Sequence, residues 1–240
     1  NDKKVGRPRG FPVVLYGADI KEGSSGMENH AICYIAGAGS WYGGPFMPKD
    51  GDCVIAADGG YRYLLEHNIR VDLVMGDFDS IERPDAGNVR AYQREKDDTD
   101  LLIAVKEGYA RGYRRFVIYG GTGGDRFDHT IGNLQVLVWL SKRGAEACMI
   151  GKNTLIFALY NRSVTLPPEL GGYISVFSMT ERAEGVSIHG LKYTMENGVL
   201  TNDYPIGVSN EFIGHTARIS VENGTPLIVA ELSDAQGIFA

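Results

Sequence analysis

The stretch "CVIAADGGYRYLLEHNIRVDLVMGD" (Cys53–Asp77) decides the fold. It contains two short apolar runs, and the segment between them carries apolar residues at helical spacing. Parallel strands need a long crossover, usually a helix, because the chain must return to the same end of the sheet. We therefore expect strands within residues 52–60 and 71–79, joined by a helix over 61–68.

The same alternation continues on both sides of this unit. It predicts strands within 31–39 and 114–121, helices over 100–112 and 128–144, and two further short strands over 146–151 and 154–159. After about Asn161 the segments become short, β-branched and punctuated by Gly, Asn and Pro. The sequence predicts an α/β plus all-β protein: a mostly parallel, doubly wound (Rossmann-like) sheet domain over 27–162, followed by a β-sandwich over 163–240.

Composition narrows the function classes. The chain has 240 residues and a net charge of −6, so it lacks the basic field typical of proteins that bind nucleic acid. No apolar run is long enough for a membrane span, and the three separated cysteines favour a reduced, cytoplasmic protein. We interpret the basic, Gly- and Pro-rich residues 1–26 as a leader or expression-derived extension that precedes a native start at Met27.

Polar residues gather at the expected carboxyl edge of the sheet. Three clusters follow predicted strands: Asp58-Gly59-Gly60, the pair Asp77 and Asp79, and "GGTGGDRFDH" (Gly120–His129). A fourth, "KDDTD" (Lys96–Asp100), opens the helix predicted over 100–112, at the point where a loop from a strand would join it. Ligands of open parallel sheets bind at the carboxyl ends of the strands, near the point where the strand order reverses. We therefore expect the clusters to converge, although each has a simpler reading. Asp58 fits an ordinary turn, and Asp98, Asp100 and Asp128 fit helix caps.

Asp77 and Asp79 indicate a cation. Two carboxylates two residues apart at a strand end repel each other, and partial burial adds to this cost unless a cation compensates. Hard oxygen ligands in an open shell suit Mg²⁺, whose remaining positions are filled by water and by substrate phosphates.

The loop Gly120–Gly124 indicates a phosphate site. Its glycines let the backbone approach an anion, a helix start follows it, and Arg126 can bind phosphate oxygens with two donors. It is not a Walker A loop, because no Gly-Lys-Ser/Thr ends it. We interpret "GAGSWYGG" (Gly37–Gly44) as a strand-end turn at the border of a nucleotide site.

Together these motifs resemble those of the bacterial thiamine pyrophosphokinases. The match extends into the second domain with "GLKY" (Gly190–Tyr193) and "GVSNEF" (Gly207–Phe212), and it covers the chain from about Ala31 onward. The resemblance implies transfer of a diphosphoryl group from ATP to thiamine, with Mg²⁺ as cofactor. It also implies a homodimer whose active sites lie at the subunit interface.

The resemblance also implies roles for particular residues. Asp77, Asp79 and Asp100 would hold Mg²⁺, and with Arg126 and Asp128 they form the expected catalytic set. The nucleotide and its phosphates would contact Asp58, Gly59, Thr99, Gly121, Gly124, Arg126 and Asp128. Thiamine would face Ser209 and Asn210. Because neither Trp41 nor Trp139 lies in the second domain, Tyr193 or Phe212 would supply an aromatic wall, and Asp100 or Asp128 would be the general base.

Two other functions fit parts of the pattern. A D-x-D motif after a strand is also found in aspartyl-phosphate phosphatases, where the first acid is the nucleophile. The same fold could equally serve a non-catalytic sensor of nucleotide or thiamine. Three carboxylates suited to a metal favour an enzyme over a sensor, and Ile81 does not fit the phosphatase motif.

Overall fold

The structure, a computed structural model, describes residues 31–42, 46–76, 89–91 and 97–232. In these ranges the helices are α1 (Gly60–Glu66), α2 (Asp100–Ala110) and α3 (Phe127–Ser141). The first seven strands are β1 (Cys33–Ala36), β2 (Cys53–Ala57), β3 (Leu73–Gly76), β4 (Val89–Ala91), β5 (Arg115–Tyr119), β6 (Glu146–Gly151) and β7 (Thr154–Ala158). The others are β8 (Ser163–Leu166), β9 (Tyr173–Ser178), β10 (Arg182–His189), β11 (Met195–Thr201), β12 (Asn210–Glu211), β13 (Ala217–Ser220) and β14 (Pro226–Glu231).

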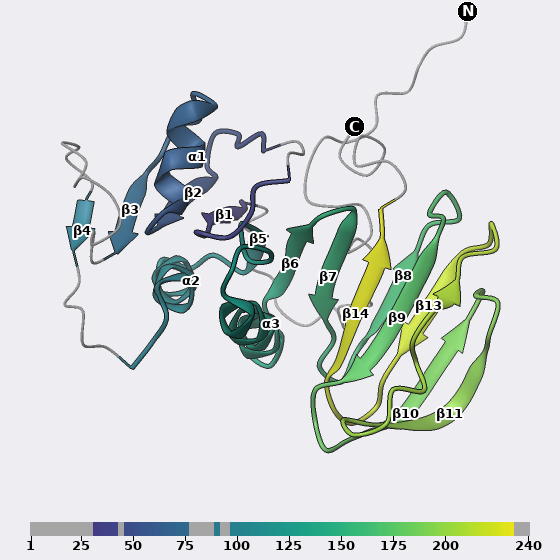
Figure 1. Cartoon of the computed structure of the whole chain (residues 1–240). Coiled ribbons are helices and arrows are strands. Elements are labelled where there is room, and N and C mark those ends of the chain that lie inside the picture. Colours follow the sequence, from purple (N-terminus) through teal and green to yellow (C-terminus); the bar gives the residue numbers. More distant parts are fainter. Residues whose placement is uncertain (1–30, 43–45, 77–88, 92–96, 233–240) are drawn as a thin grey trace, which may run out of the picture.

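One ten-stranded sheet runs through most of the molecule (Figure 1), in the order β12-β9-β14-β7-β6-β5-β1-β2-β3-β4. From β6 to β4 all neighbouring strands are parallel, as the strand–helix–strand pattern predicts. From β6 to β12 the neighbours are antiparallel. The parallel strands β1, β2 and β5 are buried at every position, which explains why they read as continuous apolar runs.

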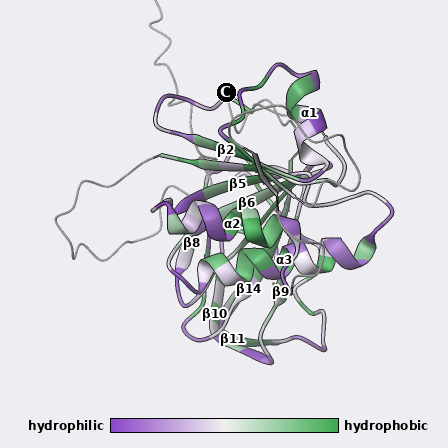
Figure 2. Ribbon diagram, turned by 90° about the vertical axis from the view of Figure 1, so that its left-hand side faces the viewer, coloured by the Kyte–Doolittle hydropathy of each residue, from purple (hydrophilic) through white to green (hydrophobic). Residues whose placement is uncertain are grey.

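The three helices cover both faces of the parallel part. Tyr34 and Ala36 of β1 share a core cluster with Leu64 of α1. Cys33 and Ile35, which point the other way, share a second cluster with α2 and α3. Figure 2 shows α2 and α3 side by side across this second face. In the described part of the chain no helix is long and apolar enough to cross a membrane.

A second sheet of four strands, in the order β11-β10-β13-β8, completes a sandwich. Val164 of β8 and Ile219 of β13 pack in the same core cluster as Phe157 of β7 and Ile228 of β14. Burial alternates along β8 and β13, as expected for strands with one face toward a core. The sandwich therefore uses the antiparallel end of the long sheet as one of its two layers.

The predicted fold class is confirmed, and the predicted helices and strands are present, whereas β4 was not predicted. The long sheet nevertheless continues across the boundary expected between residues 162 and 163, because β14 and β9 add to β7. The division at that boundary stays a prediction, and residues 1–30 lie outside the described ranges.

A cluster of three charged side chains ties the two regions together. Glu146, the first residue of β6, accepts a hydrogen bond from Arg162 at 3.0 Å and lies 3.6 Å from Arg115 of β5. All three side chains are at most 25% exposed. The guanidinium groups of Arg115 and Arg162 repel each other, and water screens this repulsion poorly because both are largely buried. The Glu146 carboxylate between them offsets the repulsion.

We therefore expect Glu146→Gln to lower the free energy of unfolding by about 2 kcal/mol, because two partly buried cations lose their counter-ion. Urea unfolding followed by circular dichroism measures this change. The control is Glu184→Gln, which breaks the exposed pair with Arg182 and should have little effect. Equal losses in the two variants would contradict the assignment.

Candidate active site

The strand order reverses next to β1. The chain places β2, β3 and β4 successively on one side of β1, and then crosses to place β5 on the other side. At such a reversal the loops after the two central strands part in opposite directions and leave a crevice at their carboxyl ends. The glycine-rich segments after β1 and β5 both begin at this point.

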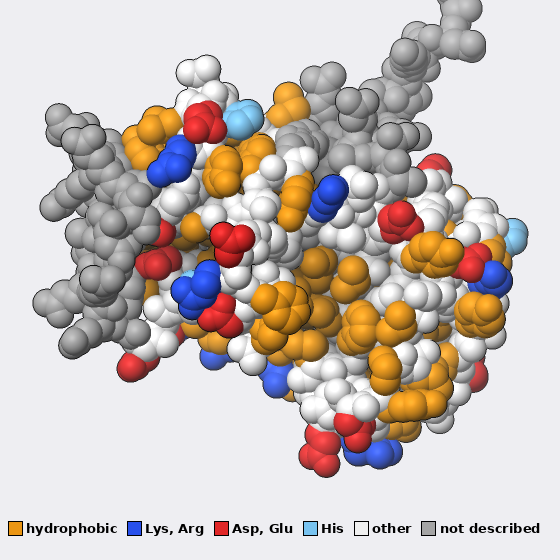
Figure 3. All heavy atoms as spheres, in the orientation of Figure 1, with side chains coloured by type: hydrophobic (Ala, Val, Ile, Leu, Met, Phe, Trp, Pro, Cys, Tyr) orange, Lys and Arg blue, Asp and Glu red, His pale blue; other side chains and the backbone are white. Residues whose placement is uncertain are grey.

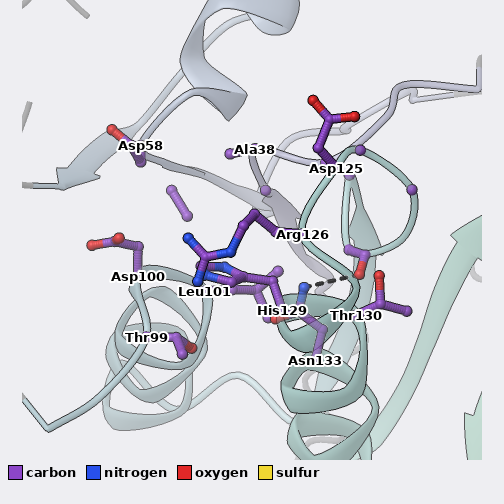
Figure 4. A pocket seen from close by; sticks show the side chains of 17 residues that line it. Ala38, Asp58, Thr99, Asp100, Leu101, Asp125, Arg126, His129, Thr130 and Asn133 are labelled. Atoms are coloured by element: carbon purple, nitrogen blue, oxygen red, sulfur yellow. Dashed lines mark hydrogen bonds between the residues drawn. The ribbon is translucent and has the colours of Figure 1, made fainter. Parts of the chain in front are cut away.

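A cavity of about 420 Å³ occupies this crevice (Figure 4). Four segments line it: the turn after β1, the end of β2, the start of α2, and the loop from β5 into α3. The lining residues are Gly37, Ala38, Gly39, Ala57, Asp58, Thr99, Asp100, Leu101, Gly120, Gly121, Gly123, Gly124, Asp125, Arg126, His129, Thr130 and Asn133. Three of the four clusters expected from the sequence therefore meet in one place.

The floor of the cavity is a close crossing of two backbone segments. The Gly39 amide donates to the Gly120 carbonyl at 2.8 Å. A Cβ on Gly37 would lie 2.6 Å from the Gly120 oxygen, and a Cβ on Gly120 would overlap the Gly37 carbonyl. Gly120 also has a φ of +63°, which other residues rarely adopt. Both positions require glycine because side chains would force the segments apart.

Two side chains hold the glycine-rich loop after β5. Ser40 donates its backbone N–H to the Thr122 carbonyl at 3.0 Å, and its Oγ accepts from the Gly124 N–H at 3.1 Å. From the other side, the buried Asn133 of α3 donates from Nδ2 to the Gly121 carbonyl at 2.8 Å. The loop is thus preorganised before any ligand is bound.

Two helices begin at the cavity. Thr99 caps α2, since its Oγ1 accepts from the Leu102 N–H at 3.3 Å. Asp98 instead pairs with Lys106 at 2.6 Å, so it does not take the capping role considered for it. The start of α3 has no side-chain cap. Helix starts carry partial positive charge, which favours an anionic ligand between them.

Two acidic groups, Asp58 and Asp100, lie on one side of the cavity in Figure 4, and Asp125 lies on the opposite side. Arg126, just before α3, and His129 of α3 extend toward Asp58 and Asp100. Asp58 follows β2 with a φ of +46°, and its N–H donates to the Met75 carbonyl at 2.7 Å. Gly76, the last residue of β3, lies against the Asp58 backbone. The chain therefore leaves β3 beside the acidic side of the cavity.

Arg126 forms a two-point ion pair with Asp128. Its Nε and Nη2 donate to the two carboxylate oxygens at 3.0 and 2.7 Å. These hydrogen bonds hold the pKa of Asp128 down to about 2. Both side chains are more than 60% exposed. A pair this exposed is weak, so a phosphate could draw the guanidinium away from Asp128.

Most of the described residues predicted for nucleotide binding line the cavity. Asp58, Thr99, Gly121, Gly124 and Arg126 are all part of its wall, and so is Asp100, which was predicted to hold Mg²⁺. Gly59 is adjacent, since its Cβ would lie 3.2 Å from that of Ala38. Asp128 is not in the lining and instead contacts Arg126. Asp77 and Asp79 lie outside the described residues.

Ser209 and Asn210 lie at the other end of the long sheet. Asn210 begins β12, the outermost strand, and it is buried. Ser209, immediately before it, has a φ of +61°, and its N–H donates to Ser175 Oγ at 3.1 Å. Neither residue lines the cavity beside β1.

Several lining residues were not predicted from the sequence. His129, Thr130 and Asn133 face the cavity from α3, and Gly37 and Gly39 face it from the turn after β1. The spacing 129, 130, 133 places three polar residues on one helix face next to the glycine loop, which is a usable signal. The turn after β1 was placed only at the border, because it lacks a recognised phosphate-binding spacing.

Carboxylate chemistry at the cavity is compatible with a divalent cation. Asp58 and Asp100 are hard oxygen ligands, and the strand that leads to Asp77 and Asp79 ends beside Asp58. Among the described residues alone, no three side chains of ligand type are grouped closely enough to hold a metal ion. Two of the three predicted ligands are outside those residues.

Comparisons with known proteins agree on one family. A family model for the thiamin pyrophosphokinase catalytic domain matches residues 47–149, and one for the vitamin B1 binding domain of the same enzyme matches 163–228. Thiamine pyrophosphokinase of Bacillus subtilis (strain 168) is 30% identical over 73% of this chain and 85% of its own length. Thiamin pyrophosphokinase 1 of Caenorhabditis elegans is 27% identical over 72% of this chain and 76% of its own.

The fold agrees as well. A crystal structure of the Bacillus subtilis thiamine pyrophosphokinase superposes with a TM-score of 0.74 at 26% identity. The match covers 85% of this chain and all of that one.

The backbone crossing generates a stability prediction. We expect Gly120→Ala to lower the free energy of unfolding by about 3 kcal/mol, because it combines an unfavourable φ with a backbone clash. Gly144→Ala is the matched control, since Gly144 has a φ of +73° with open space around it; it should cost about 1 kcal/mol. Thermal or urea unfolding measures both. A similar cost for the two variants would show that the crossing tolerates a side chain.

Proposed function

The chain belongs to the thiamine pyrophosphokinase family, and we propose that it transfers the β,γ-diphosphoryl group of ATP to the hydroxyl of thiamine, giving thiamine diphosphate and AMP. One observation supports this most directly. The cavity beside β1 combines glycine backbone and two helix starts with Asp58 and Asp100 on one side and Arg126 extending toward them from the other. That set suits a polyphosphate with its counter-ion. The family match favours this enzyme over the sensor and the phosphatase.

The reaction asks mainly for positioning and charge stabilisation. The thiamine hydroxyl oxygen attacks the β-phosphorus, the bond from that phosphorus to the bridging oxygen breaks, and AMP leaves with the electron pair. Negative charge grows on the transferred oxygens and on the departing α-phosphate. Arg126 can meet this charge at little cost, because its exposed pair with Asp128 is easily exchanged for a phosphate.

We propose that Asp77, Asp79 and Asp100 hold Mg²⁺, with Asp58 beside them. Support comes from Asp100 in the cavity lining and from Gly76, which ends β3 against Asp58 and directly precedes Asp77. When bound, the ion would neutralise charge on the phosphate oxygens. The carboxylates themselves would otherwise repel the triphosphate.

Of the two carboxylates considered as general base, Asp100 is the better candidate. The pKa of Asp128 is low only while Arg126 pairs with it, so the position of each carboxylate decides between the two. Asp100 lines the cavity, whereas Asp128 does not. The proton released by the thiamine hydroxyl would therefore pass toward the side formed by Asp58 and Asp100.

For thiamine we propose the surface around Ser209 and Tyr193. Tyr193 is 61% exposed, whereas Phe212 packs partly buried against the core. Of the two aromatic candidates, Tyr193 is therefore the one available to stack on a planar ring of the substrate.

Sheet geometry favours a homodimer. Six strand spacings separate β12 from β1 in the long sheet, which is about 29 Å at 4.8 Å per strand. Thiamine at Ser209 cannot reach a nucleotide beside β1 of the same chain across that distance. A second chain that brings its β12 region to the cavity of the first would complete the site, and two-fold symmetry would complete both.

Exposed apolar side chains suit such an interface. Tyr173, Tyr193, Tyr204, Ile206 and Ile213 are each at least 47% exposed. Figure 3 shows hydrophobic side chains gathered over the sandwich. Large apolar side chains that cluster at a protein surface commonly mark a site of interaction with another chain.

We propose a cytoplasmic location. All three cysteines are buried thiols and none forms a disulfide, which suits a reducing compartment. The substrates proposed above are small and water-soluble, so the reaction needs no membrane and no nucleic acid.

Activity is tested by mixing the protein with thiamine, ATP and Mg²⁺ and measuring products by mass spectrometry. We expect AMP and thiamine diphosphate from the wild type, and turnover lower by roughly a hundredfold or more for Asp100→Asn. Asp98→Asn is the matched control: it lies two residues away, pairs with Lys106 and should stay active. ADP as the product would instead indicate transfer of a single phosphoryl group.

The shared site is tested by complementation. Asp100→Asn and Tyr193→Ala chains should each be weakly active alone, at a thiamine concentration below the wild-type KM. After unfolding and refolding together in equal amounts, half of the dimers carry one intact site. About a quarter of wild-type activity should return. No gain over the separate variants would place both halves of the site in one chain.

A further inference from the structure

The buried side chain of Asn210 makes three hydrogen bonds to the protein backbone. Asn210 is 7% exposed, and its Oδ1 accepts from the backbone N–H groups of Tyr193 and Glu211, both at 2.9 Å. Its Nδ2 donates to the Tyr193 carbonyl at 2.7 Å. One amide group therefore bonds both the N–H and the C=O of Tyr193. This arrangement fixes the backbone at that residue from both sides.

Tyr193 needs such an anchor. It lies between β10 and β11, so no strand partner holds it, and its ring is largely exposed. The neighbouring backbone contacts are the hydrogen bond from Lys192 N–H to the Glu211 carbonyl and the bridge between Leu191 and Phe212. The Lys192 ammonium forms an exposed ion pair with Glu211 and lies 5.6 Å from the centre of the Tyr193 ring. An exposed ion pair holds a backbone weakly. The buried amide of Asn210, in contrast, bonds the backbone of Tyr193 itself.

The backbone before Asn210 is shaped to present this amide. Ser209 has a φ of +61° and is not glycine, a conformation that costs free energy and persists where the surroundings impose it. Its N–H is bonded to Ser175 Oγ on β9. Asn210 and Glu211 then pair with β9. The turn at Ser209 thus sets the strand that directs the amide toward Tyr193 and away from solvent.

We propose that Asn210 is a positioning residue for thiamine, acting through Tyr193 and not by touching the substrate. This inference rests on the proposed function, in which the exposed ring of Tyr193 stacks on thiamine. The clamp fixes the ring's attachment point before binding, so less conformational entropy is lost when the substrate docks. Removing the clamp should weaken thiamine binding and leave the distant nucleotide cavity unaffected.

A double-mutant cycle on thiamine binding distinguishes a residue that positions Tyr193 from one that contacts thiamine directly. The variants are Asn210→Ala, Tyr193→Ala and the double variant, each measured for the KM of thiamine and the KM of ATP. We expect Asn210→Ala to raise the KM of thiamine roughly tenfold, with the KM of ATP unchanged. In the Tyr193→Ala background the same change should add almost nothing, because the residue it positions is already gone. Additive effects would mean that Asn210 contacts thiamine itself and would overturn the proposal.

Two further variants guard against a loss of folding. Asn210→Asp keeps both hydrogen bonds accepted by Oδ1 but replaces the donor with a second oxygen that repels the Tyr193 carbonyl. The clamp is then broken on that side only, and the KM of thiamine should rise while circular dichroism shows a folded protein. Asn161→Ala is the control: Asn161 also accepts a backbone N–H, from Gly224 at 2.8 Å, but lies far along the chain from Tyr193. It should leave the KM of thiamine unchanged. An equal rise in Asn161→Ala would reduce the effect to general destabilisation.

The outcome can be told apart from failure of the proposed function. If the wild type makes no thiamine diphosphate, the proposed function fails. If it does so and Tyr193→Ala binds thiamine normally, the role of Asn210 fails and the activity stands. Tyr193→Phe keeps the ring, so its KM of thiamine should rise far less than that of Tyr193→Ala. An equal rise in the two variants would point to the phenol oxygen and overturn the stacking role.

Discussion

The close approach of two backbone segments, at Gly37 and Gly120, sets the geometry on which the cavity depends. Because neither position accommodates a side chain, the turns after β1 and β5 can share a hydrogen bond and still diverge. That divergence opens the crevice, and Ser40 and Asn133 then hold its glycine loop. The helix starts and the carboxylates are brought together by this crossing, not by direct contacts with one another.

The opposing charges of the cavity are held in different ways. The backbone at Asp58 is fixed by its hydrogen bond to the Met75 carbonyl on the neighbouring strand. Arg126, in contrast, is held by a solvent-exposed ion pair with Asp128. The acidic side is thus part of the scaffold, while the basic side can reorient toward a ligand. Such a division suits a reaction in which charge moves along a polyphosphate, because one side must follow that charge and the other must stay fixed.

Much of this could be predicted from residue pattern. The apolar runs at Cys53–Ala57 and Leu73–Gly76, with a helical period between them, predicted the parallel order, and strand ends located Asp58, Thr99 and Arg126. The pattern did not reveal that β9 and β14 extend the parallel sheet, because edge pairing is decided by long-range packing. Nothing in the sequence indicated that the side chain of Asn210 points into the protein. This direction depends on the positive φ of Ser209, which no spacing rule predicts for serine.

The place of β14 has a consequence for synthesis. Residues 226–231 form an interior strand, flanked by β7 and β9, although they leave the ribosome after both of these strands. Until they emerge, β9 has no route by which to join the growing sheet, and the apolar faces of β7 and β9 remain uncovered. The parallel region can form while translation continues, but β9 can join the long sheet only after β14 has emerged.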